Sequence, residues 1–107
     1  MNNNIPSKVL KLLYDFNGWL VGSSVDKQNP KDYDILIPFS EWSKACICVP
    51  DNAAKNRFGG WKFNENGIEI DIWPGDLSWF VTLPDFKKAY NYRYNVLLCK
   101  EGINEMA

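Results

Sequence analysis

Residues 19–38 read WLVGSSVDKQNPKDYDILIP, and this stretch decides the fold. Its apolar runs, 19–21 and 33–37, have the length of β-strands, and Gly22-Ser23-Ser24 between them is typical of a turn. Pro38 ends the second run because proline cannot donate a hydrogen bond to a neighbouring strand. The stretch therefore predicts a strand, a glycine turn, a polar connector and a second strand.

A helix is expected before this stretch. Apolar residues recur at helical spacing between positions 9 and 16, and Asn17-Gly18 is typical of a helix end. Ser7 or Asn4 has the side chain of an N-cap residue.

Beyond Pro38 the expected elements are short. They are, in order, a helix over 41–45 capped by Ser40, a strand over 47–49, a surface loop over 51–58, a hairpin of strands 61–63 and 68–73 around 64–67, a helical turn from 74 through 80, a short helix over 85–90 and a last strand or hairpin over 92–99. Together these elements predict an α+β fold, with a small mixed β-sheet and helices packed on one face. We expect residues 1–107 to form a single domain.

The composition excludes several classes of protein. A hydrophobic fraction of 46% and an aromatic fraction of 15% argue against disorder, and a net charge of -1 argues against a protein held to nucleic acid by its overall charge. No stretch has the pattern of a signal peptide or a membrane span, so we expect a cytoplasmic protein without a membrane partner.

Cysteine usage gives no metal or disulfide pattern. Cys46, Cys48 and Cys99 are an odd number in a chain that has no histidine, which makes a zinc site or a disulfide framework improbable. We expect all of these cysteines to be small buried apolar residues. The missing histidine also removes the commonest general base.

Acidic residues alternate with apolar ones in two of the expected strands. Asp32 and Asp34 share a strand face because side chains alternate with a period of two, and Glu69 and Asp71 share one in the same way. If these strands are neighbours, the carboxylates converge. Oxygen ligands suit Mg²⁺ or Mn²⁺, and two such ions can catalyse an in-line phosphoryl displacement without histidine. A glycine turn such as Gly22-Ser23 can approach a phosphate closely.

The order of these motifs resembles the signature of the DNA polymerase β-like nucleotidyltransferase superfamily. The matching parts are the apolar strand, Gly22-Ser23, Asp32-Tyr33-Asp34-Ile35 and a carboxylate on a later strand, Asp71. Residues 30–35 look like the CCA-adding and poly(A) polymerase branch, and residues 58–74 look like small stand-alone members of bacteria and phages. The resemblance covers about residues 5 to 80.

This resemblance implies a nucleotidyltransferase-like core that transfers a nucleoside monophosphate from an NTP to a hydroxyl acceptor and releases pyrophosphate. Asp32, Asp34 and Asp71 would be the catalytic residues and the ligands of Mg²⁺ or Mn²⁺, with Glu69 as the alternative third ligand. Gly22, Ser23 and Ser24 would bind the phosphates of the nucleotide. The alternative function is a catalytically inactive nucleotide-binding or regulatory module, such as an antitoxin-like or phage anti-defence protein.

The acceptor stays open between an RNA end, a protein and a small molecule. A partner protein or a second copy of the chain is expected to help select it. Basic and aromatic residues interleave near the end of the chain and are the local candidates for holding an acceptor: Lys87, Lys88, Tyr90, Tyr92, Arg93 and Tyr94.

Trp61, Trp73 and Trp79 are candidates for the floor of a nucleotide pocket. Arg57 and Lys62 are candidates for neutralising triphosphate charge.

Overall fold

The computed structural model describes residues 5–28, 30–100 and 104–106. The elements run in the order α1 (Ser7–Asp15), β1 (Trp19–Val21), the 3-10 helix η1 (Gly22–Val25), β2 (Asp32–Ile37), α2 (Phe39–Ile47), β3 (Ala54–Lys55), β4 (Trp61–Glu65), β5 (Ile68–Pro74), α3 (Leu77–Phe80), β6 (Lys88–Asn91), β7 (Val96–Cys99) and β8 (Asn104–Met106). None of the helices in these ranges is long and apolar enough to span a bilayer.

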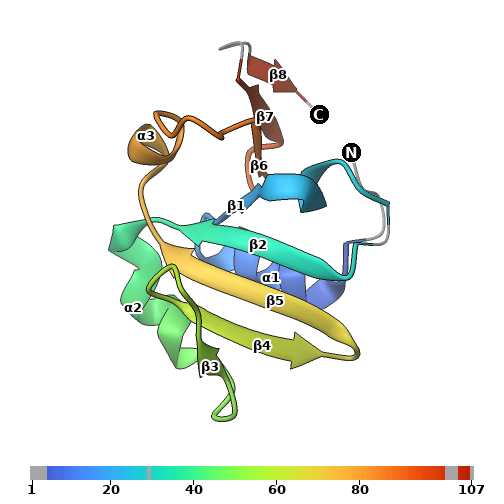
Figure 1. Ribbon diagram of the computed structural model, residues 1–107, viewed down its shortest axis with the longest axis vertical. Helices are drawn as coiled ribbons and strands as arrows, with labels where there is room; N and C mark the ends of the chain where they lie inside the picture. Colours follow the sequence, from blue (N-terminus) through green and yellow to red (C-terminus); the bar gives the residue numbers. More distant parts are fainter. Residues whose placement is uncertain (1–4, 29, 101–103, 107) are drawn as a thin grey trace.

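All the strands join one mixed sheet, as expected for an α+β fold. The sheet has eight strands in the order β3-β4-β5-β2-β1-β6-β7-β8. Among the described strands, β2 and β5 form the one parallel pair, and every other neighbouring pair is antiparallel. Figure 1 shows β2 and β5 side by side in the middle of the molecule. The sheet therefore brings together two strands that are far apart in the sequence.

The two faces of the sheet have different coverings. Both longer helices, α1 and α2, pack on one face, where alternate strand residues such as Ile35 and Ile72 are fully buried. Figure 1 shows α1 passing behind β2 and β5. The single turn of α3 joins a smaller apolar cluster on the opposite face, where Leu77 and Phe80 pack against Val21 and its neighbours. The remainder of this second face carries the acidic side chains of β2 and β5.

Several expected elements are confirmed. The first helix ends at Asp15, and the hairpin of β4 and β5 turns at Asn66-Gly67. The loop over 51–58 lies largely at the surface, although residues 54 and 55 pair with β4. Residues 92–95 connect the hairpin of β6 and β7.

Other expectations were wrong. Residues 47–49 are not a strand, because α2 extends through Ile47, and residues 88–91 form strand β6 where a helix over 85–90 was expected. Neither Ser7 nor Ser40 is an N-cap residue, since each helix begins directly after a proline, Pro6 or Pro38, and both serines lie inside their helices. Pro6 and Pro38 are themselves the N-cap residues, with ψ angles of 149° and 147°, and neither makes a side-chain cap hydrogen bond. Asn4 lies outside the described residues.

The cysteines are less buried than expected. Cys48 is exposed, and Cys46 and Cys99 are partly buried; all are free thiols. Cys48 lies directly after the last residue of α2, at its C-cap.

The start of β4 lies unusually close to β5. A Cβ atom on Gly60 would lie 1.8 Å from the carbonyl oxygen of Ile72 and 2.7 Å from Cα of Trp73. Both contacts are with backbone atoms of a central strand, which cannot move aside without breaking sheet hydrogen bonds. Position 60 therefore has room only for glycine, because a Cβ atom there would overlap the backbone of β5.

We expect Gly60→Ala to lower the free energy of unfolding by about 3 kcal/mol or more. Gly59→Ala is the matched control, because Gly59 has a φ of +84° but no atom within 4 Å of an added Cβ. That variant should lose only about 1–2 kcal/mol through backbone strain. Urea denaturation of both variants measures the difference. Equal losses of unfolding free energy in the two variants would show that a Cβ atom at position 60 does not collide with the backbone of β5.

Candidate functional site

The parallel register of β2 and β5 places their acidic residues opposite one another. Asp34 is the partner of Asp71, and Asp32 is the partner of Glu69. Since Asp32 and Asp34 are two residues apart, as are Glu69 and Asp71, all of these carboxylates lie on the same sheet face. The carboxylates were expected to converge if their two strands were neighbours, and β2 and β5 are neighbours in the sheet.

Asp34 lies at the centre of this group. Burial, followed by the negative charges of Asp71, Asp32 and Glu69, raises the pKa of Asp34 from 3.8 to about 6, while Arg57 opposes the rise. Both causes disfavour the charged form of a carboxyl group. The protein therefore holds Asp34 in a place where a cation would be favourable.

Glu69 and Asp71 interact with each other. Burial raises the pKa of Glu69, and a side-chain hydrogen bond with Asp71 and the charge of Asp71 raise it further, whereas Lys62 lowers it. Lys62 lies 3.9 Å from Glu69 as an ion pair. Asp71 is much the more buried of the two acidic residues, with 6% of its surface exposed.

The glycine turn after β1 lies against Asp34. Gly22 has a φ of +71°, and a Cβ atom there would lie 3.1 Å from Oδ2 of Asp34. Both facts favour glycine at this position. Ser23 is exposed beside it, whereas Ser24 is buried, its hydroxyl donating to the carbonyl oxygen of Val21 at 2.9 Å. The Ser24 hydroxyl is therefore used inside the protein, and it also accepts from the backbone N–H of Asp34 at 3.5 Å.

Two cavities meet at Asp34. The first, of about 550 Å³, lies beside Gly22 and Ser23, and we call it the aromatic cavity. Its rings come from Phe58, Trp73, Trp79, Phe80 and Phe86. The second, of about 450 Å³, contains all of the carboxylates, and we call it the acidic cavity. Asp34, Phe58 and Trp73 line both cavities and so form the wall between them.

The tryptophan candidates divide between the two sides of the sheet. Trp73 and Trp79 line the aromatic cavity, and Trp79 is 50% exposed. Trp61 does not line this cavity. Its β5 partner is Ile72, and Trp61 packs with it against the cluster beneath α1 and α2.

The basic and aromatic cluster near the end of the chain is not one continuous surface. Arg93 donates to the carbonyl oxygens of Tyr14 and Asp15 at the end of α1, and Tyr90 is buried. Lys88 pairs with Asp26 at 3.1 Å, while Lys87 is exposed at the aromatic cavity. Half of these residues therefore have contacts within the fold, while Lys87, Tyr92 and Tyr94 are exposed.

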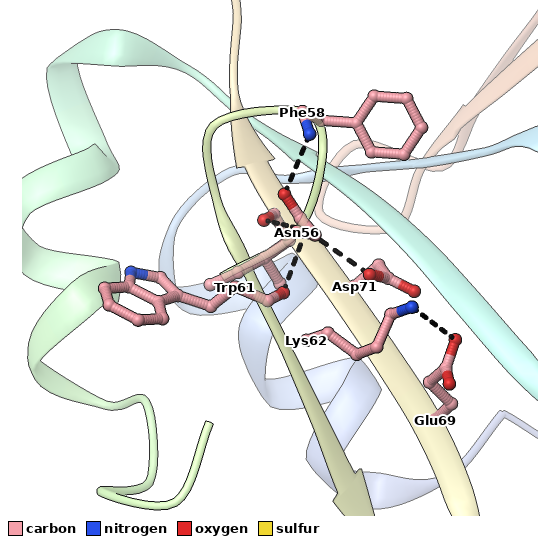
Figure 2. A network of polar contacts seen from close by, with 7 residues as sticks. Asn56, Phe58, Trp61, Lys62, Glu69 and Asp71 are labelled. Carbon is pink, nitrogen blue, oxygen red and sulfur yellow. Dashed lines mark hydrogen bonds and ion pairs between the residues drawn. The ribbon is translucent and has the colours of Figure 1, made fainter. Parts of the chain in front are cut away.

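A polar network beside Asp71 was missed by sequence reasoning. Asn56 lies at the base of the loop over residues 56–60, which we call the Asn56 loop, and its Nδ2 donates to Oδ1 of Asp71 at 3.3 Å. Its Oδ1 accepts from the backbone N–H groups of Phe58 and Gly60. Figure 2 shows this side chain among Phe58, Trp61 and Asp71. The available signal was an asparagine four residues before a glycine in a loop leading into the acidic hairpin.

The Asn56 loop also supplies a cation and a ring to the site. Arg57 and Lys55 line the acidic cavity together with Lys62. The ring of Phe58 stacks on Trp73 with centroids 4.7 Å apart, and the guanidinium of Arg57 lies 4.9 Å from the Phe58 centroid.

The chemistry of the donor set fits a hard divalent cation. Carboxylate oxygens in a partly buried, mutually repelling group are the ligands that Mg²⁺ and Mn²⁺ prefer. In the part of the chain that the structure describes, no three Asp, Glu or Cys side chains already have the spacing of a closed metal centre. Like charges without a cation repel one another, which is consistent with an open arrangement.

We expect Asp34→Asn to stabilise the protein in EDTA at about pH 8, by about 1 kcal/mol after allowance for solvent screening. Because its folded pKa, about 6, exceeds the ordinary value of 3.8, the charged form is disfavoured in the folded state. The gain should shrink as the pH falls through 6 and vanish only below about pH 3, where Asp34 is protonated in both the folded and the unfolded state. Thermal unfolding across this range measures it, with Asp51→Asn on an exposed loop as control. A gain independent of pH would contradict this electrostatic account.

No known family model matches the chain, and no curated protein matches it. Among solved structures, it is similar to one described as the complex structure of CCA-adding enzyme with ATP, with a TM-score of 0.50 and 22% sequence identity. The likeness covers 71% of this chain and 23% of that one, so the chain spans less than a quarter of the enzyme's length. At this identity the comparison establishes the fold alone, over the part of that enzyme which the chain matches.

Proposed function

We propose that this protein is a metal-dependent nucleotidyltransferase that transfers a nucleoside monophosphate from an NTP to a hydroxyl acceptor. The observation that carries the proposal is the register of Asp34 with Asp71 next to a glycine turn. A scaffold without such a function gains nothing from partly buried carboxylates that repel one another. The fold shared with part of a CCA-adding enzyme is consistent with this chemistry.

Asp32, Asp34 and Asp71 would hold Mg²⁺ or Mn²⁺, with Glu69 at the edge of the set. The bound ions would supply charge stabilisation for an in-line displacement. In that displacement the acceptor oxygen bonds to the α-phosphorus, the bond to the β-phosphate oxygen breaks, and pyrophosphate leaves. The proton of the acceptor hydroxyl passes to a carboxylate oxygen, for which Asp71 is our candidate.

Gly22 and Ser23 would bind the phosphates of the NTP. Their turn lies directly against Asp34, and its backbone can approach an anion closely because position 22 has no side chain. Arg57 and Lys62, which line the acidic cavity, would neutralise part of the triphosphate charge. Ser24 would act indirectly, by holding the turn through its buried hydroxyl.

The aromatic cavity would hold the base of the NTP. It adjoins Gly22, Ser23 and Asp34, so a nucleotide with phosphates on the turn can place its base among the rings. Stacking on aromatic rings stabilises bound bases by about 1–3 kcal/mol each. The acceptor, whether an RNA end, a protein or a small molecule, would then enter from the acidic cavity on the other side of Asp34.

We expect the wild-type protein, incubated with α-³²P-labelled NTPs and Mg²⁺ or Mn²⁺ together with total RNA or cell lysate, to transfer label to a macromolecule. Asp34→Ala should abolish both the transfer and the thermal stabilisation by Mg-ATP, because it removes the central carboxylate. Asp51→Ala, on an exposed loop, should retain both.

Persistent stabilisation of Asp34→Ala by Mg-ATP would show that the metal and nucleotide bind elsewhere. Binding by the wild type without any transfer, in every acceptor mixture, would favour the inactive nucleotide-binding module. The size class of the labelled product would identify the acceptor as RNA, protein or small molecule.

We expect Trp79→Leu to weaken binding of Mg-ATP about tenfold but to leave binding of Mg-tripolyphosphate unchanged. Tripolyphosphate has the phosphates without the base, so the difference isolates the aromatic cavity. Tyr14→Leu is the control, since Tyr14 is 55% exposed on α1 and does not line the cavity. Calorimetric titration measures both ligands. Equal weakening of both would place the base outside the aromatic cavity.

A further inference from the structure

We propose that Asn56 is a positioning residue for the carboxylate of Asp71, an inference that rests on the proposed function. Its Nδ2 donates to Oδ1 of Asp71 at 3.3 Å. A buried carboxylate can rotate, and a neutral donor fixed in place restricts it to one orientation. Partners of this kind around a metal ligand typically change metal affinity by about 10–100-fold.

Asn56 can do this because it is itself held from several directions. Its backbone N–H donates to the carbonyl oxygen of Gly60 at 3.1 Å, and its Oδ1 accepts from the N–H of Gly60 at 2.8 Å and of Phe58 at 3.1 Å. The two N–H groups of Nδ2 are shared among three acceptors, since the carbonyl oxygens of Trp61 and Ile72 lie at 3.1 and 3.2 Å in addition to Oδ1 of Asp71. Because only donors face Oδ1 and only acceptors face Nδ2, the amide has one favourable orientation.

The same network joins Asp71 to the wall between the two cavities. Oδ1 of Asn56 fixes the backbone of Phe58, and the Phe58 ring stacks on Trp73. Glu69, which shares the sheet face with Asp71, pairs with Lys62 at 3.9 Å. Asn56 therefore connects Asp71 to Phe58, which belongs to the wall between the two cavities, and fixes the position of one relative to the other.

Asn56→Asp separates this role from the structural one. The new side chain has the same shape and still accepts from the N–H groups of Phe58 and Gly60, but it no longer donates to Asp71. Its added negative charge would by itself strengthen binding of a cation. The new oxygen would also face Oδ1 of Asp71 and the carbonyl oxygens of Trp61 and Ile72, so a loss of affinity reports the lost donor together with this repulsion, which the uncharged Asn56→Ser does not introduce.

Asn64→Asp is the matched control. It makes the same chemical change on β4, where Asn64 pairs with Glu69, and the Asn64 Oδ1 accepts from the N–H of Gly67 in a similar way. In the sheet Asn64 is the partner of Glu69, whereas the β4 partner of Asp71 is Lys62.

The experiment measures binding of Mn²⁺ alone, from the electron paramagnetic resonance signal of the free ion, at a temperature where each full-length protein is folded. We expect the Kd of Asn56→Asp to rise about tenfold or more, and that of Asn64→Asp to stay within about twofold of wild type because exposed charges are screened. In the transfer assay, kcat of Asn56→Asp should fall while KM for the NTP changes little. Equal Mn²⁺ affinity in Asn56→Asp and wild type would overturn the inference.

A second variant covers the case in which Asn56→Asp does not fold. Asn56→Ser leaves space for water and should show the same loss of Mn²⁺ affinity. If neither variant folds in EDTA, Asn56 is a residue of the fold and its positioning role is wrong. A wild-type protein that binds no Mn²⁺ would contradict the proposed function itself, which distinguishes the two failures.

Discussion

The parallel pairing of β2 with β5 is the contact on which the candidate site depends. Because the pair is parallel and in register, Asp34 lies opposite Asp71 and Asp32 lies opposite Glu69. A shift of one residue would turn one set of carboxylates into the apolar face beneath α1 and α2. The same pairing buries Ile35 and Ile72 on that face, so the packing that stabilises the sheet also fixes the acidic group on the other side.

The acidic group is held together against its own repulsion. Burial and neighbouring negative charges raise the pKa of Asp34 to about 6, which means that the fold is stabilised by contacts elsewhere while this face is strained electrostatically. The glycine turn, the Asn56 loop and the stacked rings of Phe58 and Trp73 converge on the same place. Asp34 lies between the aromatic cavity, which would hold the base in the proposed function, and the acidic cavity, which would hold the metal.

The strands that carry the carboxylates could be predicted from the sequence, because alternation around Asp34 and Asp71 and the turn at Gly22 are local signals. The expected helix over 85–90 failed because pairing of β6 with β1, a contact between distant segments, overrides local preference there. Asn56 could not be found because its function arises from contacts with Asp71 and Ile72 across the hairpin. Trp61 was only a candidate for the pocket; it lies on the opposite face because its β5 partner, Ile72, is buried beneath the helices.

The most direct measurement is a crystal structure of the protein with Mn²⁺ and a non-hydrolysable ATP analogue, with data collected for the anomalous signal of manganese. The account requires an anomalous peak within ligand distance of Asp34 and Asp71, with the phosphates on Gly22 and Ser23. A bound analogue without manganese at these carboxylates, or manganese only at other acidic residues, would contradict the claim that they form a metal-dependent nucleotide site.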